Sequence, residues 1–202
     1  MSKNIELSPV QFRHAIRSGE HVGNTSGFCQ GFVQCNLVIL PADAAADFLK
    51  FCEANPKPCP LIAMSEPGAS NIPKLGTDLD IRTDIPSYKV FENGIVTQEI
   101  NDISELWRDD LVAFLLGCSF SFEEALIADG LEVRNVAEGV NVPMYTTNID
   151  CAPAGPFSGK MVVSMRPFAP EDALRAAAIS ERFPSVHGAP IHYADPQDIG
   201  IT

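Results

Sequence analysis

The sequence lacks several features that mark familiar classes of protein. No two of its six cysteines are spaced as CxxC, and its four histidines form no HExxH pattern, so neither a zinc site nor any other metal site is predicted. No apolar run approaches the ~20 residues that a membrane helix requires. The start of the chain, MSKNIELSPVQF, has no apolar core of a signal peptide. We therefore expect a cytoplasmic protein with no membrane association and with reduced cysteines.

Basic residues are also scarce. The 202 residues include 14 Lys and Arg against 26 Asp and Glu, which gives a formal net charge of -12. Such a charge repels nucleic acid and anionic membrane surfaces, so we expect neither as a partner. An anionic small molecule would need a local positive pocket in order to bind.

Apolar periodicity predicts alternating helices and strands. Strands are expected within 32–40, 61–64, 111–116, 131–133 and 161–165, a hairpin within 88–100, and helices after Ser8, within 41–55, after residue 120 and from Pro170 to Phe183. Residues 66–86 and 141–159 are expected to be loops. This order predicts an α/β class, α+β in the second half, with a mixed sheet flanked by helices. We expect two closely packed subdomains, 1–116 and 117–202.

The stretch LLGCSFSFEEAL, residues 115–126, carries the main site hypothesis. It predicts a strand that turns at Gly117 into a helix, and Ser121 with Glu124 matches a capping box. The amides of 119–123 would then lie at a helix N-terminus, where a carboxylate or phosphate is favoured. The alternative is that this stretch is a turn with no ligand.

Three other groups of side chains are open to two interpretations. Cys118 precedes the predicted helix and is either a nucleophile with a lowered pKa or a buried thiol. Gln34 and Asn36 share one face of a predicted strand, and their amides either hold neighbouring loops or point into a pocket. Asp84, with Asp78 and Asp80 near Arg82, is either an acid/base group or part of a solvated ion-pair loop.

Longer motifs identify a family. The segments NPKPCPL, IRTDIPSYKVF, WRDDLVAFLLGCSFSFEEAL, NVPMYTTNIDCAPAGPFSGKMVVSMRP and RFPSVHGAPIH together resemble the D-glutamate cyclase family, whose bacterial members are named as hydro-lyases. The resemblance runs from about Arg13 to the C-terminus. It implies a lyase that interconverts 5-oxo-D-proline plus water with D-glutamate, without a cofactor. It also implies that family members continue beyond residue 202 into a further strand, turn and helix.

This chemistry needs a cradle for a carboxylate and groups that move a proton. We assign the carboxylate to Ser119, Ser121 and the helix amides, with Arg166 as the charged partner. The acid/base candidates are Glu123, Asp84 and His187, with Cys118 kept as a catalytic candidate. The remaining polar lining is drawn from Tyr145, Thr147, Asn148, Ser158, Gln34 and Asn36.

Three functions stay open at this level. The first is a hydro-lyase acting on a small amino or hydroxy carboxylate. The second is a protein that binds a small carboxylate without turnover. The third is an enzyme of another class that uses Cys118 as its nucleophile. The expected partner is in each case a small carboxylate, and assembly into a homo-oligomer is left open.

Overall fold

The computed structural model describes residues 7–202. Met1 to Glu6 lie outside the described residues. They are half of the segment from which the absence of a signal peptide is predicted. The elements are α1 (Pro9–Arg17), β1 (Cys35–Pro41), α2 (Ala42–Ala54), β2 (Leu61–Met64), β3 (Tyr88–Glu92), β4 (Ile95–Ile100), η1 (Ser104–Leu106), β5 (Leu111–Gly117), α3 (Phe120–Ala128), α4 (Arg134–Ala137), β6 (Met144–Asp150), β7 (Lys160–Ser164), α5 (Pro170–Glu181), η2 (Pro184–Val186) and η3 (Pro196–Ile199).

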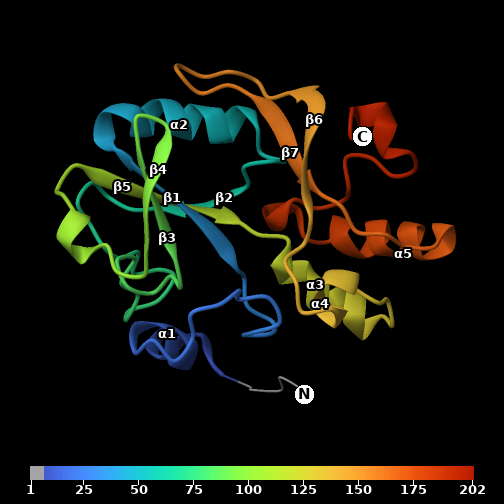
Figure 1. Ribbon diagram of the computed structural model, residues 1–202, viewed down its shortest axis with the longest axis horizontal. Coiled ribbons are helices and arrows are strands. Elements are labelled where there is room, and N and C mark those ends of the chain that lie inside the picture. The colour runs from blue at the N-terminus through green and yellow to red at the C-terminus, as the bar shows by residue number, and fades with distance from the viewer. Residues whose placement is uncertain (1–6) are drawn as a thin grey trace.

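A three-stranded antiparallel sheet in the order β1-β5-β2 lies at the centre (Figure 1). β5 is apolar along its whole length because both of its faces are covered. On one face Phe114 packs with Phe48 of α2, and their rings lie edge to face. On the other face Leu115 packs with Ile81 from the long loop between β2 and β3. β5 is therefore the rigid element from which the following turn projects.

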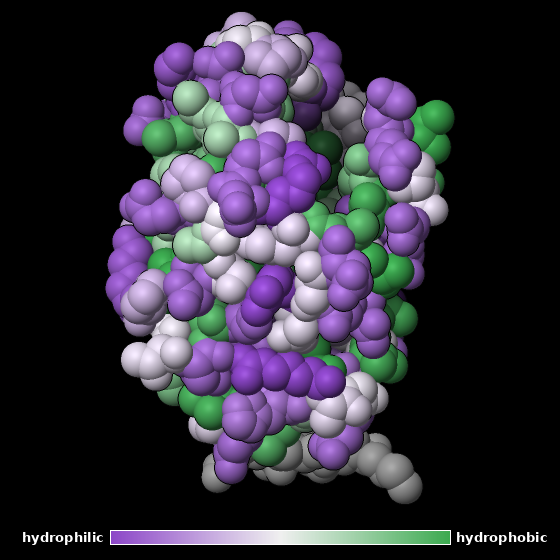
Figure 2. Space-filling view, turned by 90° about the vertical axis from the view of Figure 1, so that its left-hand side faces the viewer, coloured by the Kyte–Doolittle hydropathy of each residue, from purple (hydrophilic) through white to green (hydrophobic). Residues whose placement is uncertain are grey.

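The C-terminal half forms a second apolar cluster. α3 and α5 pack together through a cluster that includes Phe122, Leu126, Ile179 and Val186. In Figure 1 the β6–β7 hairpin lies between the sheet with α2 and the group formed by α3, α4 and α5. Its tip is held on α2, where Phe157 contacts the ring of Phe48. On the side opposite this group, shown in Figure 2, hydrophilic residues predominate and apolar residues are scattered among them.

The predicted class, helices combined with strands, is confirmed. Every strand pairing within residues 7–202 is antiparallel. The division into subdomains at residue 116 stays a prediction, since β5 runs directly into α3 across it. Within residues 7–202 we find no helix with the length and apolar character needed to cross a bilayer.

Two predicted elements are wrong. Residues 144–150, expected to be part of a loop, form β6, because the hydroxyl-rich sequence pairs with the apolar strand β7. The Thr147 hydroxyl donates to the carbonyl of Met161 where the register shifts, so a residue that looked like a loop residue stabilises the hairpin. Residues 131–133 form no strand, because Leu131 and Val133 pack against α3 and α5 as a connection that has no strand beside it.

The helix start of α3 also differs from the prediction. The helix begins at Phe120 after Ser119, and no side chain caps it. Ser121 does not cap because its hydroxyl accepts from the amide of Gln34, at 2.8 Å, and Glu124 accepts from the amide of Gly31, at 2.6 Å. Both residues of the expected capping box therefore fix the segment that precedes β1. By contrast, the predicted capping box of Ser8 and Gln11 is present at α1.

Candidate functional site

Four segments meet where β5 ends. The turn at residues 117–119 is approached by the connector 55–60, by the chain just after β7 and by η2. The connector is fixed here because the amide of Gly117 donates to the carbonyl of Pro60 at 2.8 Å. Gly117 is needed for the approach of η2, since a Cβ at this position would lie 2.2 Å from the carbonyl oxygen of Ser185. The close packing of backbone at Gly117 thus brings side chains from distant parts of the chain together.

Arg166 and Glu123 form a buried ion pair beside this turn. The guanidinium Nη2 donates to Glu123 Oε1 at 2.6 Å and to the Ser119 hydroxyl at 3.1 Å. The side chains of Arg166 and Glu123 are 10% and 4% exposed. Arg166 also lies over the ring of Phe122, 5.3 Å from its centroid. The pair fixes the orientation of Arg166 relative to α3.

Glu123 has its own set of donors. Its Oε1 also accepts from the side-chain amide of Asn135 at 3.1 Å, and its Oε2 accepts from the Ser26 hydroxyl at 3.0 Å. Each carboxylate oxygen is therefore engaged. Such a carboxylate is suited to orienting Arg166, and it is less available as an acid/base group than the sequence suggested.

One atom of Arg166 has no partner. Its Nη1 donates to the Ser164 hydroxyl at 3.1 Å, but its buried Nε has no hydrogen-bond acceptor in the described part of the chain. A buried donor without an acceptor costs about 1–3 kcal/mol, so native proteins rarely leave one. An oxygen atom of a buried water or of a bound molecule would satisfy it.

His187 lies beside the same turn. Its Nδ1 lies 2.9 Å from the carbonyl oxygen of Lys57, and because a carbonyl only accepts, Nδ1 carries the proton. Burial lowers the pKa of His187, and the charges of Lys57 and Arg166 lower it further, although the carbonyls of Lys57 and Gly117 oppose the shift. His187 is therefore favoured in its neutral form, in which the second ring nitrogen can accept a proton.

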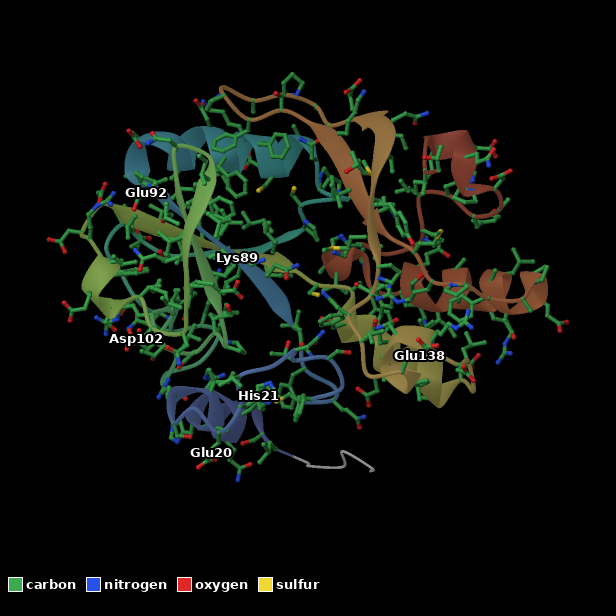
Figure 3. The ribbon with its side chains drawn as sticks, in the orientation of Figure 1. Glu20, His21, Lys89, Glu92, Asp102 and Glu138 are labelled. Atoms are coloured by element: carbon green, nitrogen blue, oxygen red, sulfur yellow. The ribbon has the colours of Figure 1, made fainter. Side chains whose placement is uncertain are left out.

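His21 lies in a different environment from His187. It lies next to α1 (Figure 3), where its ring packs against Phe12 and Phe28. Its Nε2 lies 3.0 Å from the carbonyl of Gly23, two residues away. It is a packed residue of a local loop, and it contacts none of the site residues described above.

Cys118 is buried in the turn, with its amide donating to the carbonyl of Gln34. Burial raises the pKa of the thiol, and hydrogen bonding from Phe120 and the charge of Arg166 oppose this only in part. A raised pKa disfavours the thiolate on which nucleophilic catalysis depends. Burial and the raised pKa do not favour the hypothesis that Cys118 is an activated nucleophile.

The other residues predicted for the site have different contacts, and four of them, Gln34, Asn36, Asp84 and Tyr145, line the groove that also contains Arg166 and His187. Asp84 accepts from Arg17 and from the amide of Asp80 in a network that anchors α1. The Gln34 side chain holds the loop before β1, with its oxygen accepting from Thr25 and its nitrogen donating to the carbonyl of Phe28. Asn36 is exposed and hydrogen-bonds to Cys118. The β6–β7 hairpin carries Tyr145, Thr147, Asn148 and Ser158, and the Thr147 hydroxyl is engaged within that hairpin.

The site opens onto a large groove of about 2820 Å³, whose lining includes Lys57, Cys118, Ser119, Arg166 and His187. This volume exceeds the roughly 300–1,000 Å³ typical of a small-molecule pocket. The cluster thus occupies one part of the groove. No group of three or more histidine, cysteine or carboxylate side chains within residues 7–202 has the geometry of a metal site.

Sequence patterns alone missed Ser26, Asn135, Ser164 and Lys57. The first three are short polar residues, and no local pattern distinguishes them from surface residues. Lys57 lies between two prolines in NPKPCPL, a motif that carried the family resemblance. The position of Lys57 between two prolines was the one feature of the sequence that could have indicated its role in the site.

Comparison with known proteins agrees with this resemblance. Residues 112–202 match the family model described as D-glutamate cyclase. Three relatives, each named "Putative hydro-lyase", come from Rhizobium johnstonii, Bradyrhizobium diazoefficiens and Bordetella petrii, with 61%, 59% and 58% identity. The alignments cover 96%, 96% and 94% of this chain, and 72% of each relative. The chain belongs to the D-glutamate cyclase family.

Proposed function

We propose that the protein is a hydro-lyase that interconverts D-glutamate with 5-oxo-D-proline and water. The observation that carries the proposal is the buried Nε of Arg166, which lacks an acceptor within the described residues and lies beside a neutral His187. Family membership supplies the reaction class. A substrate carboxylate or carbonyl oxygen supplies the acceptor that Arg166 lacks.

The reaction needs neither an oxidant nor a reductant. In the direction of ring opening, water adds to the lactam carbonyl carbon, the bond from that carbon to nitrogen breaks, and nitrogen takes up a proton. The products are the γ-carboxylate and the amine of D-glutamate. The reverse direction forms the carbon–nitrogen bond and releases water. Atoms and charge balance without a cofactor.

We assign each role on the contacts that support it. Arg166, oriented by Glu123, donates from Nε to a substrate oxygen, and Ser119 lies against the same guanidinium. His187 takes a proton from the attacking water and passes it to the leaving nitrogen. Its Nδ1 is held by the carbonyl of Lys57, so we assign the proton transfer to the other ring nitrogen, with the carbonyl of Gly117 also close to the ring.

The first test is a thermal-shift screen with both enantiomers of glutamate and of 5-oxoproline. A ligand at 100 times its Kd adds about 2.7 kcal/mol of stability, or roughly 5–10 °C for a chain of this size. We expect a shift with the D-enantiomers, followed by turnover measured as loss or gain of the free amine. Binding without turnover would favour a carboxylate-binding protein. The absence of any shift would overturn the proposed site.

The variant Arg166→Lys sharpens this test. It retains the positive charge and removes the Nε donor and the planar fork. We expect at least about tenfold weaker binding of 5-oxo-D-proline. Arg17→Lys is the matched control, since Arg17 makes a similar ion pair with Asp84 in the other network. Equal losses in both variants would mean that the effect comes from stability and not from ligand contact.

A further inference from the structure

Lys57 is unusual among the cations of this acidic protein. Within residues 7–202, nine of the arginine and lysine side chains form an ion pair with a carboxylate. Those in the same range without such a partner are Lys57, Lys74, Lys89 and Arg182. The last three are exposed, whereas Lys57 is half-buried. Of these, Lys89 lies on the β3–β4 hairpin (Figure 3). Within residues 7–202 the positive charge of Lys57 therefore has no carboxylate partner and is available to an anion.

Lys57 also lies at the proposed site. Its backbone carbonyl accepts from His187 Nδ1, and its ammonium donates to the carbonyl of Ala189. A Cβ on Gly188 would lie 4.0 Å from its Nζ. Lys57 lines the groove together with Arg166 and His187. Its side chain is thus held next to the histidine by the segment that carries that histidine.

The positive charges of Lys57 and Arg166 differ in how far they are available to an anionic ligand. The charge of Arg166 is balanced by Glu123 at 2.6 Å, so Arg166 offers a directed hydrogen bond with little net charge. Within the described residues, the ammonium of Lys57 meets only a neutral carbonyl, and two of its three donors remain open. In a protein with a net charge of -12, the attraction for an anion at this site comes from Lys57.

We propose that Lys57, together with the Nε of Arg166, determines specificity for a substrate that carries a free α-carboxylate. Lys57 binds that carboxylate as its counter-ion, and Arg166 donates to another oxygen of the substrate. This inference rests on the proposed function and replaces the expectation from the sequence that Arg166 is the charged partner. Lys57 positions the substrate, and the proton transfers remain with His187.

The experiment compares two ligands that differ in charge, 5-oxo-D-proline and its carboxamide, 5-oxo-D-prolinamide. Their dissociation constants are measured by calorimetry for the wild type, Lys57→Met and Lys57→Arg, with Lys74→Met as a control that removes the same charge from an exposed site outside the groove. We expect the wild type and Lys74→Met to prefer the acid over the amide by about tenfold or more. Lys57→Met should lose this preference, and Lys57→Arg should keep most of it.

The outcomes separate this inference from the proposed function. If the wild type binds neither ligand, the proposed function fails. If Lys57→Met weakens both ligands equally, Lys57 supports only the fold of residues 187–190, and the inference is overturned. The inference is also overturned if Lys57→Met retains the full preference for the acid. Loss of that preference with binding of the amide unchanged is the result that supports it.

Discussion

The molecule contains two networks in which arginines meet a buried carboxylate. In the N-terminal network, Asp84 accepts from Arg17 and from the amide of Asp80, and Arg13 pairs with Asp78 at 2.5 Å. In the C-terminal network, Arg166 pairs with Glu123 at 2.6 Å. Asp84 and Glu123 are both almost fully buried. Burial of the carboxylate and charge therefore do not distinguish the two networks.

The two networks differ in whether a hydrogen-bond donor remains without an acceptor. Among residues 7–202, Arg166 Nε is the only buried side-chain nitrogen or oxygen without a hydrogen-bond partner, so the N-terminal network contains no such atom. The N-terminal network joins α1 to the loop before β3, and its hydrogen bonds close on one another. The C-terminal network has an open donor, with a neutral histidine and a lysine that meets no carboxylate beside it. The proposed ligand site is therefore assigned from the open donor and not from charge.

Removing the carboxylates should have the largest effect. We expect Glu123→Ala to lower the free energy of unfolding by about 3–5 kcal/mol, because it leaves the guanidinium of Arg166 buried without a counter-charge. Asp84→Ala should cost less, since Arg17 is 29% exposed and can turn toward water. Chemical denaturation measures both. The double variant Glu123→Leu with Arg166→Met should recover part of the loss; if it is less stable than Glu123→Ala, the buried charge is not the cause.

The second prediction concerns Gly117, on which only the C-terminal network depends. Gly117→Ala places a methyl group against the backbone of η2 and should cost about 1–3 kcal/mol. It should also weaken binding of 5-oxo-D-proline, because the segment that carries His187 must move. Gly23→Ala is the control, since the nearest atom to its Cβ is 4.0 Å away. Unchanged affinity in Gly117→Ala would show that His187 does not contact the ligand.

The sequence predicted the parts of the fold that local patterns determine. The apolar run of β5, the capping box of α1 and the ENG turn between β3 and β4 each act within a few residues. β6 was missed because its stability comes from pairing with β7 and not from its own composition. The capping box at Ser121 was wrong because two amides distant in sequence, those of Gly31 and Gln34, compete for the same side chains.

The candidate site was predictable only in part for the same reason. The turn after β5 was identified from its sequence, and Ser119, Glu123, Arg166 and His187 do meet there. Asp84 and the residues of the β6–β7 hairpin were grouped with them on residue type alone. Ser26, Asn135 and Lys57 enter through long-range packing at Gly117 and α3, which a single sequence does not display.

The third prediction concerns how the free energy of unfolding depends on pH through His187. Because the pKa of His187 is lowered in the folded protein, its neutral form stabilises the fold fully above the unfolded value of about 6.5. That stability is lost as the pH falls from there toward the folded pKa, since the unfolded chain then binds the extra proton. The free energy of unfolding of His187→Gln should depend less on pH in this window than that of the wild type. His14→Gln, at an exposed position of α1, should behave like the wild type.

The smallest effect is expected at Cys118, the residue on which the alternative of a cysteine enzyme depends. Burial raises the pKa of its thiol, so Cys118→Ser should retain turnover and lose at most about 1 kcal/mol of stability. Iodoacetamide at neutral pH should label Cys118 in the folded protein far more slowly than in the urea-unfolded chain. Rapid labelling that 5-oxo-D-proline blocks, together with loss of turnover in Cys118→Ser, would move the reactive group from His187 to the thiol. Arg166 would then donate a hydrogen bond to an acyl intermediate formed on the sulfur of Cys118. The reactive thiol, and not the open donor of Arg166, would then be the feature that distinguishes the C-terminal network.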